Sequence, residues 1–258
     1  MKHLILLTAL LGTVLGLTLD ETNHVVLRGE ISSDTVGPAM VKMGLIASNR
    51  SEVFLVLVSG GGSVRAGNSI IHQINYLQEN NVTISCIATY AASMAFSIFQ
   101  SCSNRYVTST SILMQHQMSV EGIGGPFENI YSYISFMNQL EDANSKLQSE
   151  RLGMSLKDFK EQTEHDWWLL GSNAVTHNVA DSVTLAGCAP SLYQEETDMQ
   201  IESFFGTIKM TYSSCPMVEG PLTITLSGNN ETLLTNNIKL QVLQEARIVP
   251  DPGKIIDY

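Results

Sequence analysis

A serine between two apolar segments is the first residue of this sequence that suggests chemistry. Ser93 follows a short β-branched segment, residues 82–88, and precedes an apolar run, residues 94–99, that predicts a helix. A hydroxyl at the start of a helix lies beside unpaired backbone N–H groups, which stabilise negative charge. This position suits a nucleophile whose attack produces an oxyanion. Serine is also a common helix N-cap, so Ser93 alone leaves both interpretations open.

A histidine and an aspartate follow at some distance. His116 lies inside an apolar, strand-like run, residues 112–118, where a hydrogen-bonded core histidine is the usual explanation. Asp166 lies at the end of a helix that the sequence predicts from Ser155 to about residue 168, where a solvated acid is common. The order serine, histidine, aspartate is nevertheless one that a catalytic triad can use.

A triple glycine follows another apolar segment. Residues 53–58 form a continuous apolar run, and Gly60, Gly61 and Gly62 come after Ser59. Glycines let the backbone approach a ligand and present N–H groups, as phosphate-binding loops do. Neither a Gly-Lys-Ser/Thr ending nor a Gly-x-Gly-x-x-Gly spacing is present, so a nucleotide site is weakly supported. An oxyanion-binding loop facing the serine fits better, and a tight turn is the simplest alternative.

Alternating strands and helices must position these residues. Strands are expected within residues 23–31, 53–58 and 82–88, with helical spacing of apolar residues between them and again over residues 127–152. This alternation is typical of an α/β layered fold with parallel strands. Sites in such folds lie beyond the carboxyl ends of the strands. The triple glycine and Ser93 both follow strands, so we expect them to share one crevice.

Composition and spacing disfavour several classes of partner and cofactor. The 258 residues include 25 Asp and Glu against 14 Lys and Arg, a net charge of −11, so we expect no nucleic-acid partner. No Cys-x-x-Cys or His-x-x-x-His spacing occurs, so neither a metal nor another cofactor is expected. Among four cysteines, Cys188 and Cys215 are predicted to form a disulfide in the C-terminal third. Cys86 and Cys102 are interpreted as core packing.

The two ends of the chain differ from its middle. A basic start, a short apolar core and a small residue at Gly16 predict that residues 1–16 are a signal peptide, or alternatively an N-terminal anchor. If residues 1–16 are a signal peptide, we expect a periplasmic or secreted protein. If they are not, we expect a membrane-anchored or cytoplasmic protein. Residues 17–185 are predicted to form the main domain and residues 186–258 a small β-rich extension, entered through a polar linker near residues 190–198. β-like runs within the extension are expected at residues 204–212, 222–226 and 238–243.

Four segments, in unbroken order, resemble motifs of the ClpP family of serine peptidases. Residues 59–67 are similar to Ser-Pro-Gly-Gly-Ser-Val-x-Ala-Gly, and residues 91–95 to Ala-Ala-Ser-Met-Gly. Residues 114–117 are similar to Met-Ile-His-Gln, and residues 163–175 to the family's Thr-x-Arg-Asp segment with its later Glu-Ala. Each motif alone is weak, but together they are specific. The resemblance implies the ClpP/crotonase-like layered fold of parallel strands and flanking helices.

The resemblance also implies a role for each site residue. Ser93 would be the nucleophile, His116 the base that accepts its proton, and Asp166 the carboxylate that orients the imidazole. The backbone N–H groups of Gly62 and Met94 would form the oxyanion hole. The expected activity is that of an endopeptidase acting on peptides or unfolded proteins.

An assembly follows from the same resemblance. Family members form heptameric rings that stack in pairs through a long helix, to which residues 127–152 correspond, and degrade peptides inside the chamber. We therefore expect a homo-oligomeric ring. The usual partner of the family is a cytoplasmic ATPase, which an exported chain would lack, so the question of an ATPase partner stays open.

The sequence departs from the family motifs at four positions, and three alternatives stay open. Gly60 replaces Pro, Ala95 replaces Gly, Gln115 replaces Ile and Met118 replaces Pro, and none of these changes removes a catalytic atom. The alternatives are a catalytically silent or structural ring subunit, a signal-peptide-peptidase-like enzyme with a Ser-Lys pair, and an acyl-CoA-handling enzyme of the crotonase type. The Ser-His-Asp order disfavours all three, and no lysine lies in the segments beside Ser93.

Overall fold

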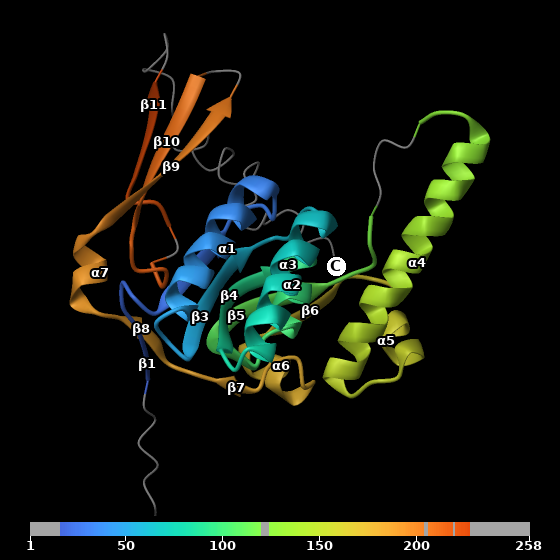
Figure 1. The fold of residues 1–258 in the computed structure, drawn as a ribbon, viewed down its shortest axis with the longest axis horizontal. Coiled ribbons are helices and arrows are strands. Elements are labelled where there is room, and N and C mark those ends of the chain that lie inside the picture. Colours follow the sequence, from blue (N-terminus) through green and yellow to red (C-terminus); the bar gives the residue numbers. More distant parts are fainter. Residues whose placement is uncertain (1–15, 120–123, 204–205, 219, 228–258) are drawn as a thin grey trace, which may run out of the picture.

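A parallel sheet forms the centre of the computed structural model, which describes residues 16–119, 124–203, 206–218 and 220–227 (Figure 1). Four consecutive strands run parallel, a fifth lies antiparallel at the edge, and a short sixth pairs in parallel with the last of the four. The predicted α/β fold with parallel strands is confirmed. The strands are β2 (His24–Arg28), β3 (Glu52–Ser59), β4 (Thr83–Ala92), β5 (Asn104–Gln115), the antiparallel β6 (Trp167–Leu170) and β7 (Ser182–Val183).

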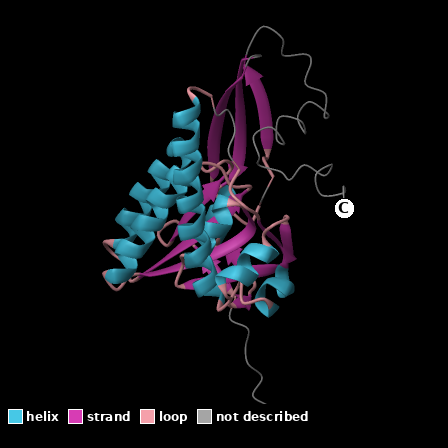
Figure 2. Cartoon of the chain, turned by 90° about the vertical axis from the view of Figure 1, so that its right-hand side faces the viewer, coloured by secondary structure: helices cyan, strands magenta, loops and turns pink. Residues whose placement is uncertain are grey.

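Helices connect the strands and pack on the sheet (Figures 1 and 2). Three of them, together with the sheet, enclose the main core. A much longer helix, α4, stands at the edge of the body and extends beyond it, with α5 at its base (Figure 1). Within the described residues, no helix combines the length and the apolar character that a membrane span requires. The helices are α1 (Ser33–Ala47), α2 (Val64–Glu79), α3 (Met94–Gln100), α4 (Phe127–Leu152), α5 (Leu156–Gln162) and α6 (Gly171–Thr176).

The interior of β3, residues 53–58, is apolar because both faces of the sheet are covered. Val53, Leu55 and Leu57 belong to the core beneath the helices, whereas Val56 and Val58 belong to a separate cluster on the opposite face. Successive side chains of a strand point to opposite faces, so one strand contributes to both clusters. A continuous apolar run is typical of a parallel strand buried on both sides.

The opposite face is covered by segments from both ends of the described chain. β1 (Leu17–Leu19) pairs in parallel with β8 (Ala186–Cys188), and Leu19 packs in the cluster that contains Val56. A short helix, α7 (Pro190–Gln194), adds its buried leucine to the same cluster. The start of the C-terminal extension is therefore part of the sheet's second covering layer.

A disulfide fixes this layer. Cys188 is bonded to Cys215, with Cα atoms 5.8 Å apart, so the predicted bridge is confirmed. A second disulfide joins Cys86 of β4 to Cys102, just after α3. The interpretation of these two cysteines as core packing alone was therefore incomplete: both are fully or almost fully buried, and they are also bonded to each other. α3 runs back along the sheet from the end of β4, so the residue after α3 lies close to the first half of β4. Spacing along the sequence does not reveal this contact.

The extension continues as a three-stranded antiparallel sheet that rises from the body at the end opposite α4 (Figure 1). Its strands are β9 (Glu196–Ser203), β10 (Gly206–Ser213) and β11 (Thr223–Ser227). The predicted polar linker near residues 190–198 was wrong, because α7 and the start of β9 occupy this segment. A polar residue of β9 bonds across to β10: Asp198 accepts a hydrogen bond from Thr211. The β-like run predicted at residues 238–243 lies outside the described residues.

Two predicted boundaries next to the site residues were also wrong. β5 ends at Gln115, so His116 lies just beyond the strand rather than inside it. The helix predicted from Ser155 to about residue 168 ends at Gln162, and Trp167 begins β6. β6 forms because it pairs with β5, a long-range contact that overrides the local pattern.

Candidate active site

Ser93 is the single residue between β4 and α3. Its backbone has φ 54° and ψ −120°, a left-handed conformation that is uncommon for a residue with a side chain. Its side chain makes no capping hydrogen bond to α3, so the helix N-cap alternative does not describe this serine. Its backbone N–H donates to the Met114 carbonyl (2.9 Å), which ties the turn to β5. Backbone strain of this kind costs about 1–3 kcal/mol and clusters at functional sites.

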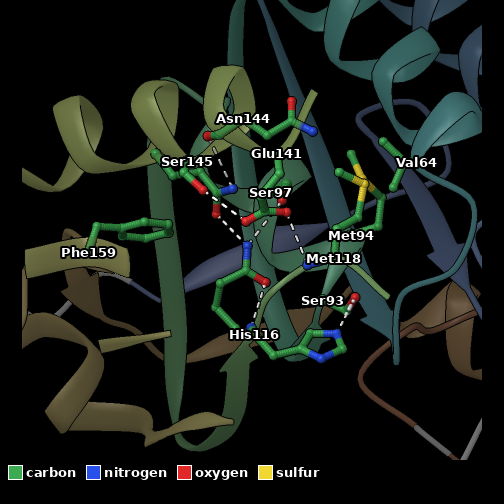
Figure 3. A pocket seen from close by; sticks show the side chains of 12 residues that line it. Val64, Ser93, Met94, Ser97, His116, Met118, Glu141, Asn144, Ser145 and Phe159 are labelled. Atoms are coloured by element: carbon green, nitrogen blue, oxygen red, sulfur yellow. Dashed lines mark hydrogen bonds between the residues drawn. The ribbon is translucent and has the colours of Figure 1, made fainter. Parts of the chain in front are cut away.

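His116 faces Ser93 directly. Its Nε2 lies 2.8 Å from the Oγ of Ser93, a distance typical of a hydrogen bond (Figure 3). The histidine follows β5, the strand beside β4, so the carboxyl ends of two neighbouring parallel strands supply the pair. This is the edge of the sheet at which sites of α/β folds collect.

Asp166 reaches His116 through the pairing of β5 with β6. Gln115 pairs with Trp167 in the antiparallel register. Continuing this register by one residue brings His116, which follows Gln115, opposite Asp166, which precedes Trp167. The Oδ1 of Asp166 accordingly lies 3.8 Å from the Nδ1 of His116. This distance is longer than a hydrogen bond, and catalytic hydrogen bonds often tighten only when substrate binds. All three residues selected by the sequence thus lie at one place.

The glycine loop packs against the start of α3. A Cβ atom on Gly61 would lie 2.7 Å from the Cβ of Ser93 and 3.0 Å from the backbone N of Met94. A Cβ on Gly62 would lie 2.5 Å from the Ile31 carbonyl oxygen, and both glycines have positive φ (99° and 144°). Only glycine fits this loop without displacement of the backbone around it.

Hydrogen bonds with Ile31 set the orientation of the loop. The Ile31 N–H donates to the Gly61 carbonyl (2.8 Å), and the Ser63 N–H donates to the Ile31 carbonyl (2.7 Å). Gly62 lies between these two contacts, in a parallel bridge with Ile31. Backbone groups alternate in direction along an extended chain, so the Gly62 N–H points away from Ile31.

A pocket opens beside Ser93 and His116, between the start of α3, the end of β5 and α4 (Figure 3). One part of its lining is apolar and another part is polar. No group of three or more His, Cys, Asp or Glu side chains in the described part of the chain is arranged to hold a metal ion. The lining residues from these elements and their neighbours are Val64, Met94, Met118 and Phe159, with Ser97, Gln115, Glu141, Asn144, Ser145 and Gln148.

Comparison with known proteins agrees with this geometry. The family model described as Clp protease matches residues 14–186, about two thirds of the chain. The chain belongs to the Clp protease family. This membership makes it a serine-type peptidase, that is, a hydrolase.

Two curated members of the Clp protease family illustrate the distance to known proteins. The ATP-dependent Clp protease proteolytic subunit 2 of Bifidobacterium longum (strain NCC 2705) is 23% identical over 158 residues, covering 60% of this chain and 75% of that protein. The protein of the same name from Borreliella burgdorferi is 22% identical over 186 residues, covering 71% of this chain and 88% of that protein. The match of the family model ends at residue 186, where the extension begins.

In this Clp protease family member, a buried polar network supports the histidine. Gln115 donates from its Nε2 to the Oε1 of Gln148 (2.6 Å) and toward the Oγ of Ser97 (3.3 Å). Its own Oε1 accepts from the His116 backbone N–H (3.2 Å). The network thereby connects β5, α3 and α4 immediately beside the Ser93–His116 pair. Fully satisfied buried polar networks fix one arrangement of the elements they join.

The residues that α4 contributes to the pocket are not among those predicted from the sequence. The apolar positions of this helix predicted its spacing, yet its buried side chains are Ser145, Gln148, Ser149 and Leu152. Glu141 lies one helical turn before Ser145, so the polar residues that face the pocket follow a spacing of three and four. This stripe of polar residues is the feature of the sequence from which the pocket-facing side of α4 could have been predicted.

Proposed function

We propose that the protein is an endopeptidase that cleaves peptide bonds with Ser93, His116 and Asp166. The observation that carries the proposal is the 2.8 Å contact between His116 Nε2 and Ser93 Oγ. His116 takes the proton of the Ser93 hydroxyl as the oxygen attacks the substrate carbonyl, and later returns it to the leaving amine. Asp166, on the Nδ1 side of the ring, holds the imidazole in the orientation this transfer needs.

We propose that the backbone N–H groups of Gly62 and Met94 stabilise the tetrahedral oxyanion. Met94 begins α3, where the first N–H groups of a helix lack intrahelical acceptors. The Gly62 N–H is directed away from Ile31, and the adjacent Gly61 lies against Ser93 and Met94. Loss of one donor of this kind typically lowers the rate by about 10²–10³.

We further propose a homo-oligomeric ring that takes peptides or unfolded chains as substrates, with seven subunits per ring as the family resemblance implies. Family membership supports this assembly, and so does α4, whose first half stands clear of the body (Figure 1). Size-exclusion chromatography with light scattering tests it. A mass of one subunit at micromolar concentration would contradict the proposal.

We also propose that the protein is exported after removal of residues 1–16. The two disulfides support this compartment, because disulfides persist mainly in oxidising environments. Mass spectrometry of the protein recovered from an export-competent host should find a start near Leu17. An intact Met1 in the membrane fraction would instead indicate an anchor.

Labelling with a fluorophosphonate, which reacts with activated serines, tests the catalytic proposal. The wild-type protein should be labelled at Ser93, and Ser93→Ala should lose both labelling and hydrolysis, the latter by about 10⁴–10⁶-fold. Ser69→Ala is the matched control, since Ser69 is an exposed serine of α2 that should leave both readouts unchanged. Absence of labelling in the folded wild-type protein would favour a catalytically silent ring subunit.

A Ser-Lys mechanism makes a different prediction for the same experiment. The described lining of the pocket contains no lysine, so this alternative has no base in position. Under the proposed mechanism, His116→Ala should abolish labelling. Full labelling of His116→Ala would contradict the assignment of His116 as the base.

A further inference from the structure

Glu141 places a carboxylate in the pocket that contains Ser93. The residue belongs to α4 and lines the same cavity as Ser93 and Met94. Figure 3 shows its side chain and the Ser93–His116 pair around this cavity. The proposed reaction needs no further acid here, because Asp166 already lies on the other side of the imidazole.

Two hydrogen bonds hold this carboxylate in place. Its Oε2 accepts from the backbone N–H of Met118, and its Oε1 accepts from the Oγ of Ser145, both at 3.0 Å. Ser145 is buried one turn further along α4, and Met118 follows the segment that carries His116. A carboxylate fixed from two sides is a preorganised feature of the pocket rather than a mobile surface group.

The contact with Met118 depends on a departure from the family motif. Met118 stands where the resembling motif has proline. Proline carries no backbone N–H and could not donate to Glu141. The residue that departs from the motif is therefore the one that positions the carboxylate.

No basic side chain compensates Glu141 within the described residues. The ion pairs of its neighbours on α4 lie elsewhere: Asp142 pairs with Lys160, and Lys146 with Glu150. The described lining of the pocket includes neither Lys nor Arg. A partly buried carboxylate without a cation is a site at which a charged ligand group replaces the missing partner.

The remainder of the pocket suits a long side chain with a charged end. Val64, Met94 and Met118 provide apolar surface, and Glu141 provides the acceptor. Lysine and arginine have this character, because an apolar stem carries their cationic group.

We propose that this pocket selects peptides with lysine or arginine as the residue whose carbonyl Ser93 attacks. The inference rests on the proposed function, since it assigns the pocket beside Ser93 to the side chain on the acyl side of the cleaved bond. The apolar wall contacts the stem, and Glu141 accepts hydrogen bonds from the ammonium or guanidinium. The protein is thus a peptidase for basic residues.

The test uses fluorogenic peptides that differ only in this one residue. Wild-type kcat/KM should be about 10–100-fold higher for lysine or arginine than for glutamine or leucine, as expected for a hydrogen-bonded charge pair. Glu141→Gln should remove this preference by lowering kcat/KM for the basic substrates, with little change for leucine. Glu141→Lys should favour glutamate instead. Asp142→Asn is the matched control, because it removes a neighbouring charge outside the pocket and should keep the wild-type preference.

Fluorophosphonate labelling of Ser93, measured on every variant, separates the two proposals. A wild-type protein that is labelled and hydrolyses leucine substrates faster than lysine substrates overturns the basic specificity and leaves the proposed function standing. The basic specificity is also overturned if the Glu141→Gln variant is labelled and still prefers lysine or arginine substrates as the wild-type protein does. If the Glu141→Gln variant is not labelled, the basic specificity is judged from the wild-type protein alone, by its kcat/KM for lysine and arginine substrates relative to leucine and glutamine substrates. A wild-type protein without labelling overturns both proposals.

Discussion

The two faces of the central sheet are stabilised in different ways. On one face α1, α2 and α3 pack over a large continuous core that includes Leu27, Leu55 and Phe96. On the other face a small cluster around Val56 and Leu19 lies beneath β1, β8 and α7. A large core stabilises its elements mainly by burial, to which the Cys86–Cys102 disulfide adds here, whereas a small core depends more on other constraints. The Cys188–Cys215 disulfide supplies such a constraint on the second face.

Polar contacts add to the attachment of the extension. The Arg28 guanidinium lies 4.8 Å from the ring centroid of Tyr212 and donates to the carbonyls of Pro216 and Val218 at 3.4 Å. Such contacts contribute less than burial of apolar surface. The comparison therefore predicts that the extension can loosen while the helix-covered face and the site persist.

The largest effect is expected from an ion pair in the body of the protein. Arg105 is buried, with 2% of its side chain exposed, and its guanidinium lies 2.6 Å from Asp181 Oδ1. Burial alone would raise the pKa of Asp181, but the hydrogen bonds and charge of Arg105 outweigh it, and the net pKa is lowered. Asp181→Ala leaves the buried arginine charge unpaired and should cost about 3–4 kcal/mol of unfolding free energy, toward the lower end for a buried pair because 38% of the Asp181 side chain is exposed.

Urea unfolding followed by tryptophan fluorescence measures this loss, because both tryptophans lie in β6 and report on the body. The matched control is Asp198→Ala in the extension, where Asp198 pairs with Lys209 at the surface. Exposed pairs contribute little, so this variant should unfold like the wild-type protein. Equal losses in both variants would contradict the distinction between the two regions.

Much of the helix-covered face could be predicted from the sequence, because its pattern is local. The predicted helix over residues 127–152 agrees with α4, the apolar run at residues 53–58 falls within β3, and the run at residues 82–88 lies in β4 except for its first residue. Periodicity of this kind reports the environment of one element at a time. The continuous apolar run of β3 is typical of a strand buried on both faces, but it does not show that the C-terminal extension covers one of them.

The missed features depend on contacts between distant segments. β6 is four residues long and forms only against β5, so the local pattern suggested a helix end. The order of motifs selected Ser93, His116 and Asp166, but which residues of α4 face them depends on how that helix docks. Tertiary contacts of this type override propensity and spacing.

The two disulfides provide the second test. Replacement of Cys188 and Cys215 by serine opens a loop of 27 residues and should cost about 3 kcal/mol in the chain-entropy model. The loss should fall on the extension, so limited proteolysis should cleave it faster while peptide hydrolysis continues.

The matched variant replaces Cys86 and Cys102, 16 residues apart on either side of Ser93. It should cost a similar amount but lower the temperature at which hydrolysis is lost. Loss of hydrolysis in the first variant would show that the site depends on the extension.

A pair of substitutions on β3 gives a smaller and more local comparison. Val53 and Val56 are the same residue type, both fully buried, and belong to the clusters on opposite faces. Val53→Ala and Val56→Ala each remove two methyl groups and should cost about 1–2 kcal/mol. Val53→Ala should lower the urea midpoint of tryptophan fluorescence, whereas Val56→Ala should mainly accelerate proteolysis of the extension. Identical behaviour would mean that the two faces unfold as one unit.

The smallest effect concerns the pH dependence of the second face. His24 pairs in register with Phe54, which packs against the cluster on that face, and its side chain is almost completely buried. Burial lowers the pKa of His24, and the charge of Lys42 acts in the same direction, against the hydrogen bond to the Asp20 carbonyl and the charges of Asp20 and Glu21.

Because the folded protein holds His24 below its ordinary pKa of about 6.5, the unfolded chain binds more protons as the pH falls. The contribution of neutral His24 to stability is therefore complete above pH 6.5 and declines below it, down to the folded pKa. Proteolysis of the extension should accelerate in the wild-type protein as the pH falls below about 6.5. His24→Gln keeps a neutral donor for the Asp20 carbonyl and should show a weaker pH dependence below this pH. If the variant and the wild-type protein respond to pH alike, His24 is not the group that couples protonation to this face.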